Sequence, residues 1–249
     1  MRIVFLTTDD PIYLPAFFER VLGRWATETV AVYMVPPLYR NQSRPAAAWR
    51  YHRTFGTRAT VELARRIFEA RLMRQSISSS CERYGVPCAM AADVNTREFI
   101  GELAALRPDL VVSVSCPQIF KRELIEIPPK GCLNVHGAVL PNYRGVMPSF
   151  WMLANGETTA GVTVHFVDER VDAGEVCGQA FFEIAPDESL DRFLRRSKHV
   201  AAELLLDVLP RIESGTVERR PVDLTQGSYY SWPDRDAVKR LAAGGRRLW

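Results

Sequence analysis

The sequence contains no pair of cysteines at the spacing of a zinc site or a small disulfide framework. Its five cysteines are odd in number, scattered along the chain and free of any C-x-x-C pair. Scattered thiols of this kind are typical of proteins in a reducing compartment. We therefore predict a cytoplasmic protein that binds no metal ion.

Long apolar runs and a strong charge excess are absent as well. No segment approaches the roughly 20 apolar residues that a membrane-spanning helix requires, and the apolar N-terminal run is too short for a signal peptide. The 32 Lys and Arg residues against 29 Asp and Glu residues give a formal net charge of +3, which does not by itself indicate a nucleic-acid-binding surface. We predict no membrane association and no nucleic-acid partner, and the sequence leaves a homo-oligomer open.

Glycine is missing from the first turn, where nucleotide-binding α/β domains place a phosphate loop. An apolar run over residues 2–7 predicts a buried strand, and the turn after it contains Asp9 and Asp10 in place of glycines. Neither the dinucleotide nor the P-loop fingerprint is met, and the two carboxylates would repel an anion. We interpret both acids as charges at the N-terminus of the next helix; in the alternative, Asp9 contacts a substrate amine.

Short apolar runs alternate with amphipathic segments along most of the chain. The strand-like runs include residues 2–7, 29–35, 110–114 and 132–135. The order strand, helix, strand predicts an α/β fold of Rossmann-like type, with a mostly parallel sheet and helices on both faces. We expect a catalytic domain over residues 1–210 and a small C-terminal appendage over residues 211–249, which are polar, aromatic and basic.

Nine arginines lie between positions 40 and 74, against Glu62 and Glu69 as the only acids. Val61, Phe68 and Leu72 belong to an apolar stripe at helical spacing in this segment. One interpretation is a long surface helix, in which Glu62 pairs with an arginine one turn away at position 66. The other is a wall that binds the anion of a phosphorylated substrate.

The stretch from Gly131 to Gly174 places its polar residues at the ends of apolar runs. Asn134 and His136 are two residues apart, so both side chains project from one face of an extended strand. Asp172 lies in an acidic loop that ends a later β-branched run. An amide, an imidazole and a carboxylate that converge suit attack by a neutral amine on a carbonyl.

The same three residues predict a division of chemical roles. The amide of Asn134 and a protonated His136 can donate hydrogen bonds to a developing oxyanion, while Asp172 keeps the imidazole charged and relays a proton. No Ser, Cys or Lys is paired with a base in this set, so direct transfer is favoured over a covalent intermediate. His165, in the middle of the β-branched run, is interpreted as a structural histidine.

Several ordered motifs carry a resemblance to one enzyme family. They read Asn134-Val-His136, Leu140-Pro-Asn-Tyr-Arg-Gly145, Pro148, Asn155-Gly-Glu157, Gly161-Val-Thr163 and Val167-Asp-Glu-Arg-Val-Asp172-Ala-Gly174. Through these motifs the chain resembles the folate-dependent formyltransferases, closely over residues 108–180 and loosely before them. That family includes phosphoribosylglycinamide, methionyl-tRNA and sugar N-formyltransferases.

The resemblance implies a formyl donor, N10-formyltetrahydrofolate, and assigns residues to it. In the family the Asn, His and Asp of these motifs are catalytic, which implies the same for Asn134, His136 and Asp172. The family's pterin lies between two segments of the chain. Here those segments are Gln118, Ile119 and Phe120 on one side and Val167, Asp168, Glu169, Arg170 and Val171 on the other.

The amine acceptor is narrowed by features outside the motifs. The turn without glycine argues against phosphoribosylglycinamide, residues 215–249 leave no room for the long C-terminal domain of the tRNA enzyme, and the arginine-rich segment offers a partner for phosphate. We expect a primary amine on a small molecule, with a nucleotide-linked amino sugar or a specialised metabolite favoured. Tyr143, Arg144 and Asp9 are the expected substrate-binding residues, and Arg144 either holds its loop or binds an acceptor phosphate.

Two alternative functions stay open at this point. The first is a catalytically idle regulator that binds folate or a nucleotide on the same scaffold. The second is formylation of an aminoacyl or ribonucleotide amine. Both alternatives keep the same fold, so the choice between them depends on the site.

Overall fold

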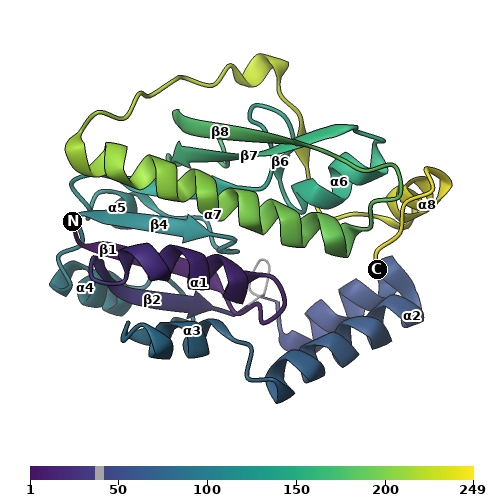
Figure 1. The fold of residues 1–249 in the computed structure, drawn as a ribbon, viewed down its shortest axis with the longest axis horizontal. Coiled ribbons are helices and arrows are strands. Elements are labelled where there is room, and N and C mark those ends of the chain that lie inside the picture. The colour runs from purple at the N-terminus through teal and green to yellow at the C-terminus, as the bar shows by residue number, and fades with distance from the viewer. Residues whose placement is uncertain (37–41) are drawn as a thin grey trace.

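The computed structural model describes residues 1–36 and 42–249, so Arg40, the first arginine of the basic segment, lies outside the described residues. A seven-stranded sheet forms the centre, in the order β3-β2-β1-β4-β5-β7-β8 (Figure 1). Its strands are β1 (Ile3–Thr8), β2 (Thr29–Val35), β3 (Cys88–Met90), β4 (Leu110–Val114), β5 (Cys132–His136), β7 (Thr159–Phe166) and β8 (Val176–Glu183).

The first five strands pair in parallel, whereas β7 and β8 are antiparallel to their neighbours. Strand β4 follows β3 in sequence but pairs on the other side of β1, so the chain changes direction across the sheet between β1 and β4. Ligands of open α/β sheets bind beyond the carboxyl ends of strands at such a point. The predicted Rossmann-like, mostly parallel sheet is confirmed.

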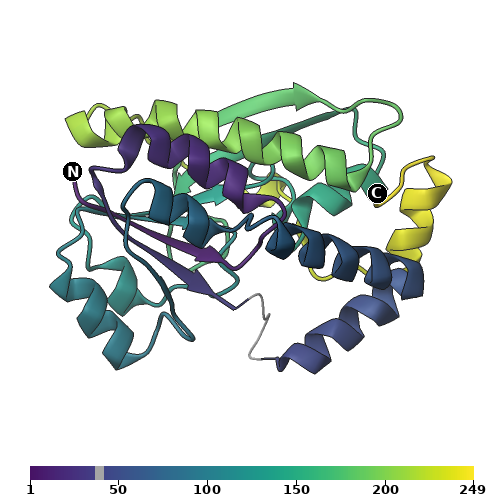
Figure 2. The same cartoon turned by 60° about the horizontal axis from the view of Figure 1, so that its bottom comes forward.

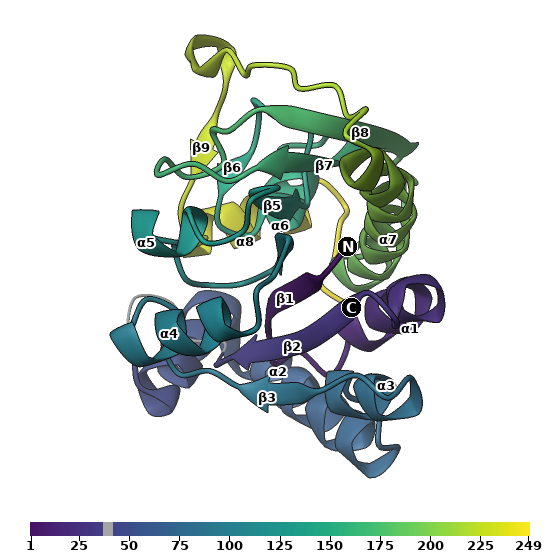
Figure 3. The ribbon, with the colours of Figure 1, turned by 90° about the vertical axis from the view of Figure 1, so that its left-hand side faces the viewer.

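Helices cover both faces of the sheet (Figure 3). One face carries α1 (Leu14–Trp25), α3 (Ile77–Arg83) and α7 (Leu190–Ser214), and the other carries α4 (Arg97–Ala105) and α5 (Arg122–Ile125). The strand β1 shows why, because Ile3 and Phe5 join the first core while Val4 and Leu6 join the second. A strand with apolar side chains on both faces must be covered on both.

The turn after β1 contains Asp9 and Asp10, which were predicted to lie at the N-terminus of the next helix. Helix α1 begins only at Leu14 and has no acid in its first turn. The carboxylate of Asp10 instead accepts the backbone N–H groups of Ile12 (2.8 Å) and Tyr13 (3.1 Å), which closes a turn ahead of the helix. Asp10 thus lies just before the N-terminus of α1, and the interpretation of Asp9 and Asp10 as charges that complement the helix dipole stays a prediction.

The arginine-rich segment forms the long helix α2 (Arg44–Leu72), with a kink at Gly56, where φ is 83°. The predicted pair of Glu62 and Arg66 is present at 2.8 Å. The apolar stripe, however, faces solvent, since Phe68 is 67% and Leu72 74% exposed. Figure 2 shows α2 at the edge of the molecule, with α8 (Arg235–Ala243) beside it.

The C-terminal residues return to the main domain. Helix α7 continues through Pro210 and ends at Gly215, so the boundary expected at residue 210 falls inside this helix. The elements after it are η2 (Leu224–Gln226), β9 (Tyr229–Tyr230) and α8, and β9 pairs with β6 (Arg144–Gly145). Helix α8 packs on α6 (Pro148–Ala154) in a third apolar cluster. Within residues 1–36 and 42–249, no helix is both long enough and apolar enough to cross a membrane.

Candidate active site

Asn134, His136 and Asp172 meet at the carboxyl end of β5. The Nδ2 of Asn134 lies 3.3 Å from the Oδ1 of Asp172, and the Nδ1 of His136 lies 3.6 Å from the same oxygen. The strand supplies the first two side chains, and the loop between β7 and β8 supplies the third. The amide, the imidazole and the carboxylate are thus neighbours, as their pattern in the sequence led us to expect.

The carboxylate of Asp172 is held in its ionised form. Burial opposes ionisation, but the imidazoles of His136 and His165 and the N–H of Gly145, which donates to Asp172 at 2.8 Å, outweigh it. The pKa of this carboxyl group therefore lies well below its ordinary value. A buried carboxylate with several donors is a fixed negative charge beside the imidazole.

Both ring nitrogens of His136 face oxygen atoms. Its Nε2 lies 2.9 Å from the carbonyl oxygen of Tyr143, and its Nδ1 faces Asp172. Burial lowers the pKa of His136, and the nearby carboxylate opposes this effect without reversing it. Only the doubly protonated ring can donate to both oxygens, so burial and hydrogen bonding favour different protonation states.

His165 is a member of this site that the sequence did not assign to it. It faces Asn134 across the pair β5 and β7, and its Nε2 lies 3.2 Å from the Nδ2 of Asn134. Its Nδ1 lies 2.8 Å from the carbonyl oxygen of Phe166, which makes Nδ1 the donor and leaves Nε2 to accept from Asn134. His165 is satisfied, as a structural histidine should be, and it also orients the amide. Only the register between β5 and β7 reveals this contact.

Two of the three predicted substrate-binding residues lie beside the trio of Asn134, His136 and Asp172. The carbonyl of Tyr143 reaches His136, while its hydroxyl donates to Glu157. The Nε of Arg144 is buried and has no acceptor among the described residues.

The third, Asp9, is not brought to the trio. Its backbone N–H donates to Val35 of β2 at 3.2 Å, and β2 lies on the far side of β1 from β5.

The first predicted wall of the donor site follows β4. The side chain of Gln118 is tied down, because it accepts from the N–H of Val94 and donates to the carbonyl of Ala92, both at 2.8 Å. Phe120 is buried in the second core cluster, whereas Ile119 is 63% exposed. Of these three side chains, only that of Ile119 is free to cover an apolar ligand.

The second predicted wall, residues 167–171, adjoins the first. Val167 packs on the cluster that contains Phe120. The carboxylate of Glu126, and to a smaller extent that of Glu169, raises the pKa of Arg122 in α5. Asp168 accepts from the backbone N–H of Arg170 at 2.8 Å, which closes the turn. The half-buried Val171 precedes Asp172 directly, so this wall leads into the trio.

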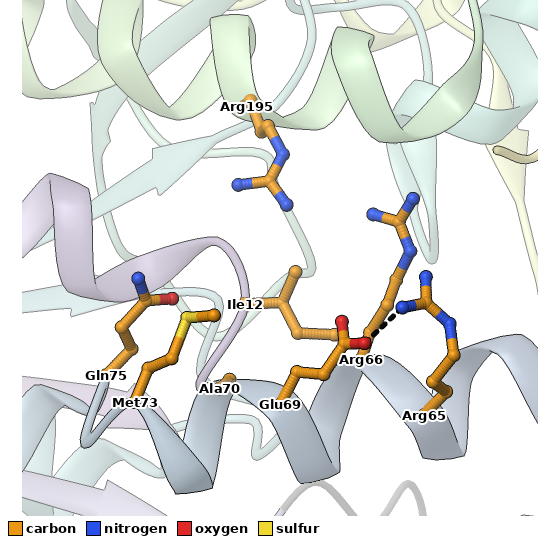
Figure 4. Close-up of a pocket in the computed structure, with 8 residues that line it drawn as sticks. All are labelled: Ile12, Arg65, Arg66, Glu69, Ala70, Met73, Gln75 and Arg195. Carbon is orange, nitrogen blue, oxygen red and sulfur yellow. Dashed lines mark hydrogen bonds and ion pairs between the residues drawn. The ribbon is translucent and has the colours of Figure 1, made fainter.

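Two cavities lie on α2, away from the trio. One of about 500 Å³ is lined by Arg58, Val61, Glu62 and Trp249, and one of about 280 Å³ lies between α2, α7 and the turn before α1 (Figure 4). Across the described part of the chain, no group of His, Cys, Asp and Glu is arranged to hold a metal ion. The candidate active site at β5 is therefore identified by the grouping of Asn134, His136 and Asp172, and not by the size of a cavity.

Comparison with known proteins agrees with this chemistry. Residues 1–209 match the family model described as formyl transferase. The chain belongs to this formyl transferase family. Methionyl-tRNA formyltransferase of Trichlorobacter lovleyi is 39% identical over 147 residues, which are 59% of this chain and 46% of that protein. The chain spans about half the length of the curated relatives it matches.

Solved structures show the same fold. A 4-N formyltransferase from Francisella tularensis aligns with a TM-score of 0.62 at 18% identity, over 98% of this chain and 86% of that one. The N-formyltransferase from Helicobacter canadensis, solved in complex with folinic acid and dTDP-3-aminofucose, aligns with a TM-score of 0.61 at 18% identity, over 93% and 71% of the two chains. Both likenesses establish the fold of this chain.

Proposed function

We propose that this formyltransferase transfers a formyl group from N10-formyltetrahydrofolate to a primary amine of a small molecule, with a nucleotide-linked amino sugar as the favoured acceptor. The observation that carries the proposal is the convergence of Asn134, His136 and Asp172 at the carboxyl end of β5. The Helicobacter canadensis structure, with folinic acid and an amino sugar nucleotide bound, supports both the donor and the acceptor class.

The donor would lie between the exposed Ile119 and the loop of residues 167–171, which includes the half-buried Val167 and Val171. Apolar side chains on both sides of a site suit the flat ring of a pterin. N10-formyltetrahydrofolate supplies the formyl group when it is bound there. The side chains of Gln118 and Phe120 support this wall from behind, since both are engaged inside the protein.

The trio would stabilise negative charge on the formyl oxygen and accept the proton of the amine. Asn134 donates both amino hydrogens to His165 and Asp172, so it must turn one of them toward the formyl oxygen. A preorganised donor of this kind commonly contributes about 3 kcal/mol to the transition state. The ionised Asp172 would accept the proton that the attacking amine releases. The bond between the formyl carbon and N10 would then break, and that proton would pass to N10, which releases tetrahydrofolate and the formylated amine.

The acceptor phosphate would bind in the 280 Å³ cavity on α2. Three guanidinium groups and one carboxylate line it, from Arg65, Arg66, Arg195 and Glu69. Figure 4 shows Arg195 of α7 pointing across the cavity toward Arg66. Arg65 and Arg66 are already ion-paired, with acids that include Glu62. The Nε of Arg195 donates to Asp191 at 3.4 Å and its guanidinium lies 5.6 Å from the centre of the Tyr13 ring, while its terminal nitrogens donate to none of the residues in 1–36 and 42–249. These terminal nitrogens are the donors that remain for a phosphate.

One turn of α7 separates Arg195, which lines this cavity, from Lys198. Lys198 follows Arg195 by three residues and donates to Ser115 at the end of β4, at 2.6 Å. Its charge acts on both Asp10 and His136, contributing to the pKa of each. An acceptor whose phosphate lies at Arg195 would therefore run along Lys198 and present its amine near His136.

A second acceptor is favoured by a separate observation. Methionyl-tRNA formyltransferases from two bacteria are 39% and 31% identical to this chain over the matched residues, which favours an aminoacyl amine on tRNA. A regulator without activity is the third candidate, and the intact trio argues against it.

Mass analysis distinguishes these candidates. The protein is incubated with N10-formyltetrahydrofolate and, in separate reactions, with nucleotide-linked amino sugars, free amino acids and methionyl-tRNA. We expect a formyl mass increment on an amino sugar nucleotide. An increment on methionyl-tRNA alone would transfer the assignment to the second acceptor, and folate binding without any product would favour the regulator.

A further inference from the structure

A short strand from the end of the chain lies against the loop that completes the active site. Strand β9 (Tyr229–Tyr230) pairs in parallel with β6 (Arg144–Gly145), and Figure 3 shows the two side by side. The family match ends at residue 209, so β9 is not part of the segment that defines the family. The segment nevertheless binds the loop of Tyr143 to Val146, and residues of that loop contact His136 and Asp172.

Three backbone N–H groups of the loop are held by this segment. The N–H of Tyr143 donates to the Oγ of Ser228 at 2.8 Å, that of Arg144 to the carbonyl of Ser228 at 3.0 Å, and that of Val146 to the carbonyl of Tyr230 at 2.8 Å. Ser228 therefore binds two consecutive N–H groups. Such a clamp leaves the loop little freedom to shift.

The clamped loop also touches the trio, through Tyr143 and through Gly145, which lies between the held N–H groups of Arg144 and Val146. The carbonyl of Tyr143 lies 2.9 Å from the Nε2 of His136, and the N–H of Gly145 donates to the Oδ2 of Asp172 at 2.8 Å. The loop is thus bound on one side to β9 and on the other side to the imidazole and the carboxylate. A displacement of the loop would change both catalytic groups together.

Two close approaches bring the segments together. A side chain at Gly145, where φ is 95°, would place its Cβ 2.2 Å from the carbonyl oxygen of Tyr230, and one at Gly227 would lie 2.4 Å from the carbonyl oxygen of Pro141. Only glycine permits contacts this short. Stacking of Tyr143 on Tyr230, with ring centroids 5.2 Å apart, adds a side-chain contact.

We infer that Ser228 and β9 position the catalytic trio, by fixing the loop whose backbone binds His136 and Asp172. Ser228 is a positioning residue, because it acts through Tyr143 and touches no reacting atom. The predicted effect of Ser228 on turnover rests on the proposed function. Its effect on the His136 ring is independent of that proposal and can be measured without a substrate.

The test uses the variant Ser228→Ala, which removes one acceptor of the clamp but keeps the backbone pairing. Ser228→Thr restores the hydroxyl, and Ser231→Ala is the control, since Ser231 is exposed and lies in the same segment. The His136 ring is titrated by NMR in the full chain, with assignment by comparison with His136→Gln. Asp172, His165 and Lys198 are the charged or titratable groups that act on this ring, and all three are unchanged in these variants.

We expect the measured pKa of His136 to fall in Ser228→Ala, because the carbonyl of Tyr143 stabilises the charged ring. Ser228→Thr should restore it and Ser231→Ala should leave it unchanged. In the transfer assay kcat should drop roughly tenfold while both KM values stay near wild type, as expected for a small misplacement of catalytic groups. A wild-type His136 titration in Ser228→Ala would overturn the inference, whether or not the protein transfers formyl groups. A wild-type kcat in that variant, in a protein that does transfer them, would overturn it as well.

Discussion

The amino group of Asn134 donates to Asp172 at 3.3 Å and to the ring of His165 at 3.2 Å. Both of its hydrogens are therefore engaged before any formyl oxygen arrives. This pairing fixes which way the amide points, because its oxygen cannot face an ionised carboxylate at that distance. The same contact makes the site sensitive to a substitution that exchanges a single heavy atom, the amide nitrogen for an oxygen.

Asn134→Asp should reduce kcat by about 100-fold to 1000-fold, the usual loss for one oxyanion donor. The substitution would remove the amide N–H donor, and the new carboxylate would also repel the carboxylate of Asp172. Asn142→Ala is the matched control, because Asn142 is exposed in the following loop. Steady-state rates with donor and amine check this prediction, and a kcat within a few-fold of wild type would remove Asn134 from the mechanism.

Stability should fall as the pH is lowered from neutral, and His136 and Asp172 should both contribute. Each has a folded-state pKa below its ordinary value, so each binds more protons when the chain is unfolded. The effect of His136 begins below its ordinary pKa of about 6.5, and that of Asp172 below about 3.9. Thermal unfolding between pH 7 and pH 3 measures both.

Substitution separates the two contributions to this pH dependence. His136→Gln should flatten the curve near pH 6, and Asp172→Asn should flatten it below about pH 4, the range in which aspartate titrates. An unchanged slope in both variants would contradict the assignment of these buried groups.

Arg195→Ala should raise the KM for a nucleotide-linked amine roughly 10-fold to 100-fold, the effect of losing one charge-assisted hydrogen bond. The KM for the folate donor should not change, because the donor walls lie elsewhere. Arg192→Ala, on the same helix, is the control, since Arg192 pairs with Asp187 and Glu188. Equal KM values for Arg195→Ala and Arg192→Ala would exclude the cavity in Figure 4 as the phosphate site.

Neighbouring residues of the first donor wall should respond in opposite ways. Ile119→Ser changes an exposed side chain and should raise the KM for the donor roughly tenfold at unchanged stability, by lost apolar contact. Phe120→Ala opens a cavity in the core and should cost about 3–5 kcal/mol of unfolding free energy. Denaturant unfolding and donor kinetics on both variants check this contrast, which fails if Ile119→Ser leaves donor KM unchanged.

The class of fold and the placement of Asn134 and His136 on one face of β5 follow from local patterns in the sequence. Buried runs such as residues 110–114 can only be strands covered on both faces, which requires an α/β arrangement. The strand period of two places Asn134 and His136 on one face regardless of what surrounds them. The side chains of a strand alternate between its two faces because of the backbone geometry, so this placement can be predicted from local sequence.

The residues that lie opposite Asn134 and His136 depend on contacts between segments that are distant in the sequence. The register of β5 with β7 brings His165 to Asn134, and the return of β9 brings Ser228 to the loop beside His136. The spacing of apolar residues such as Phe68 predicts one face of the helix α2. The spacing does not determine whether another segment covers that face, and in the structure Phe68 is exposed. Periodicity describes each surface, whereas contacts between distant segments depend on how all the surfaces pack together.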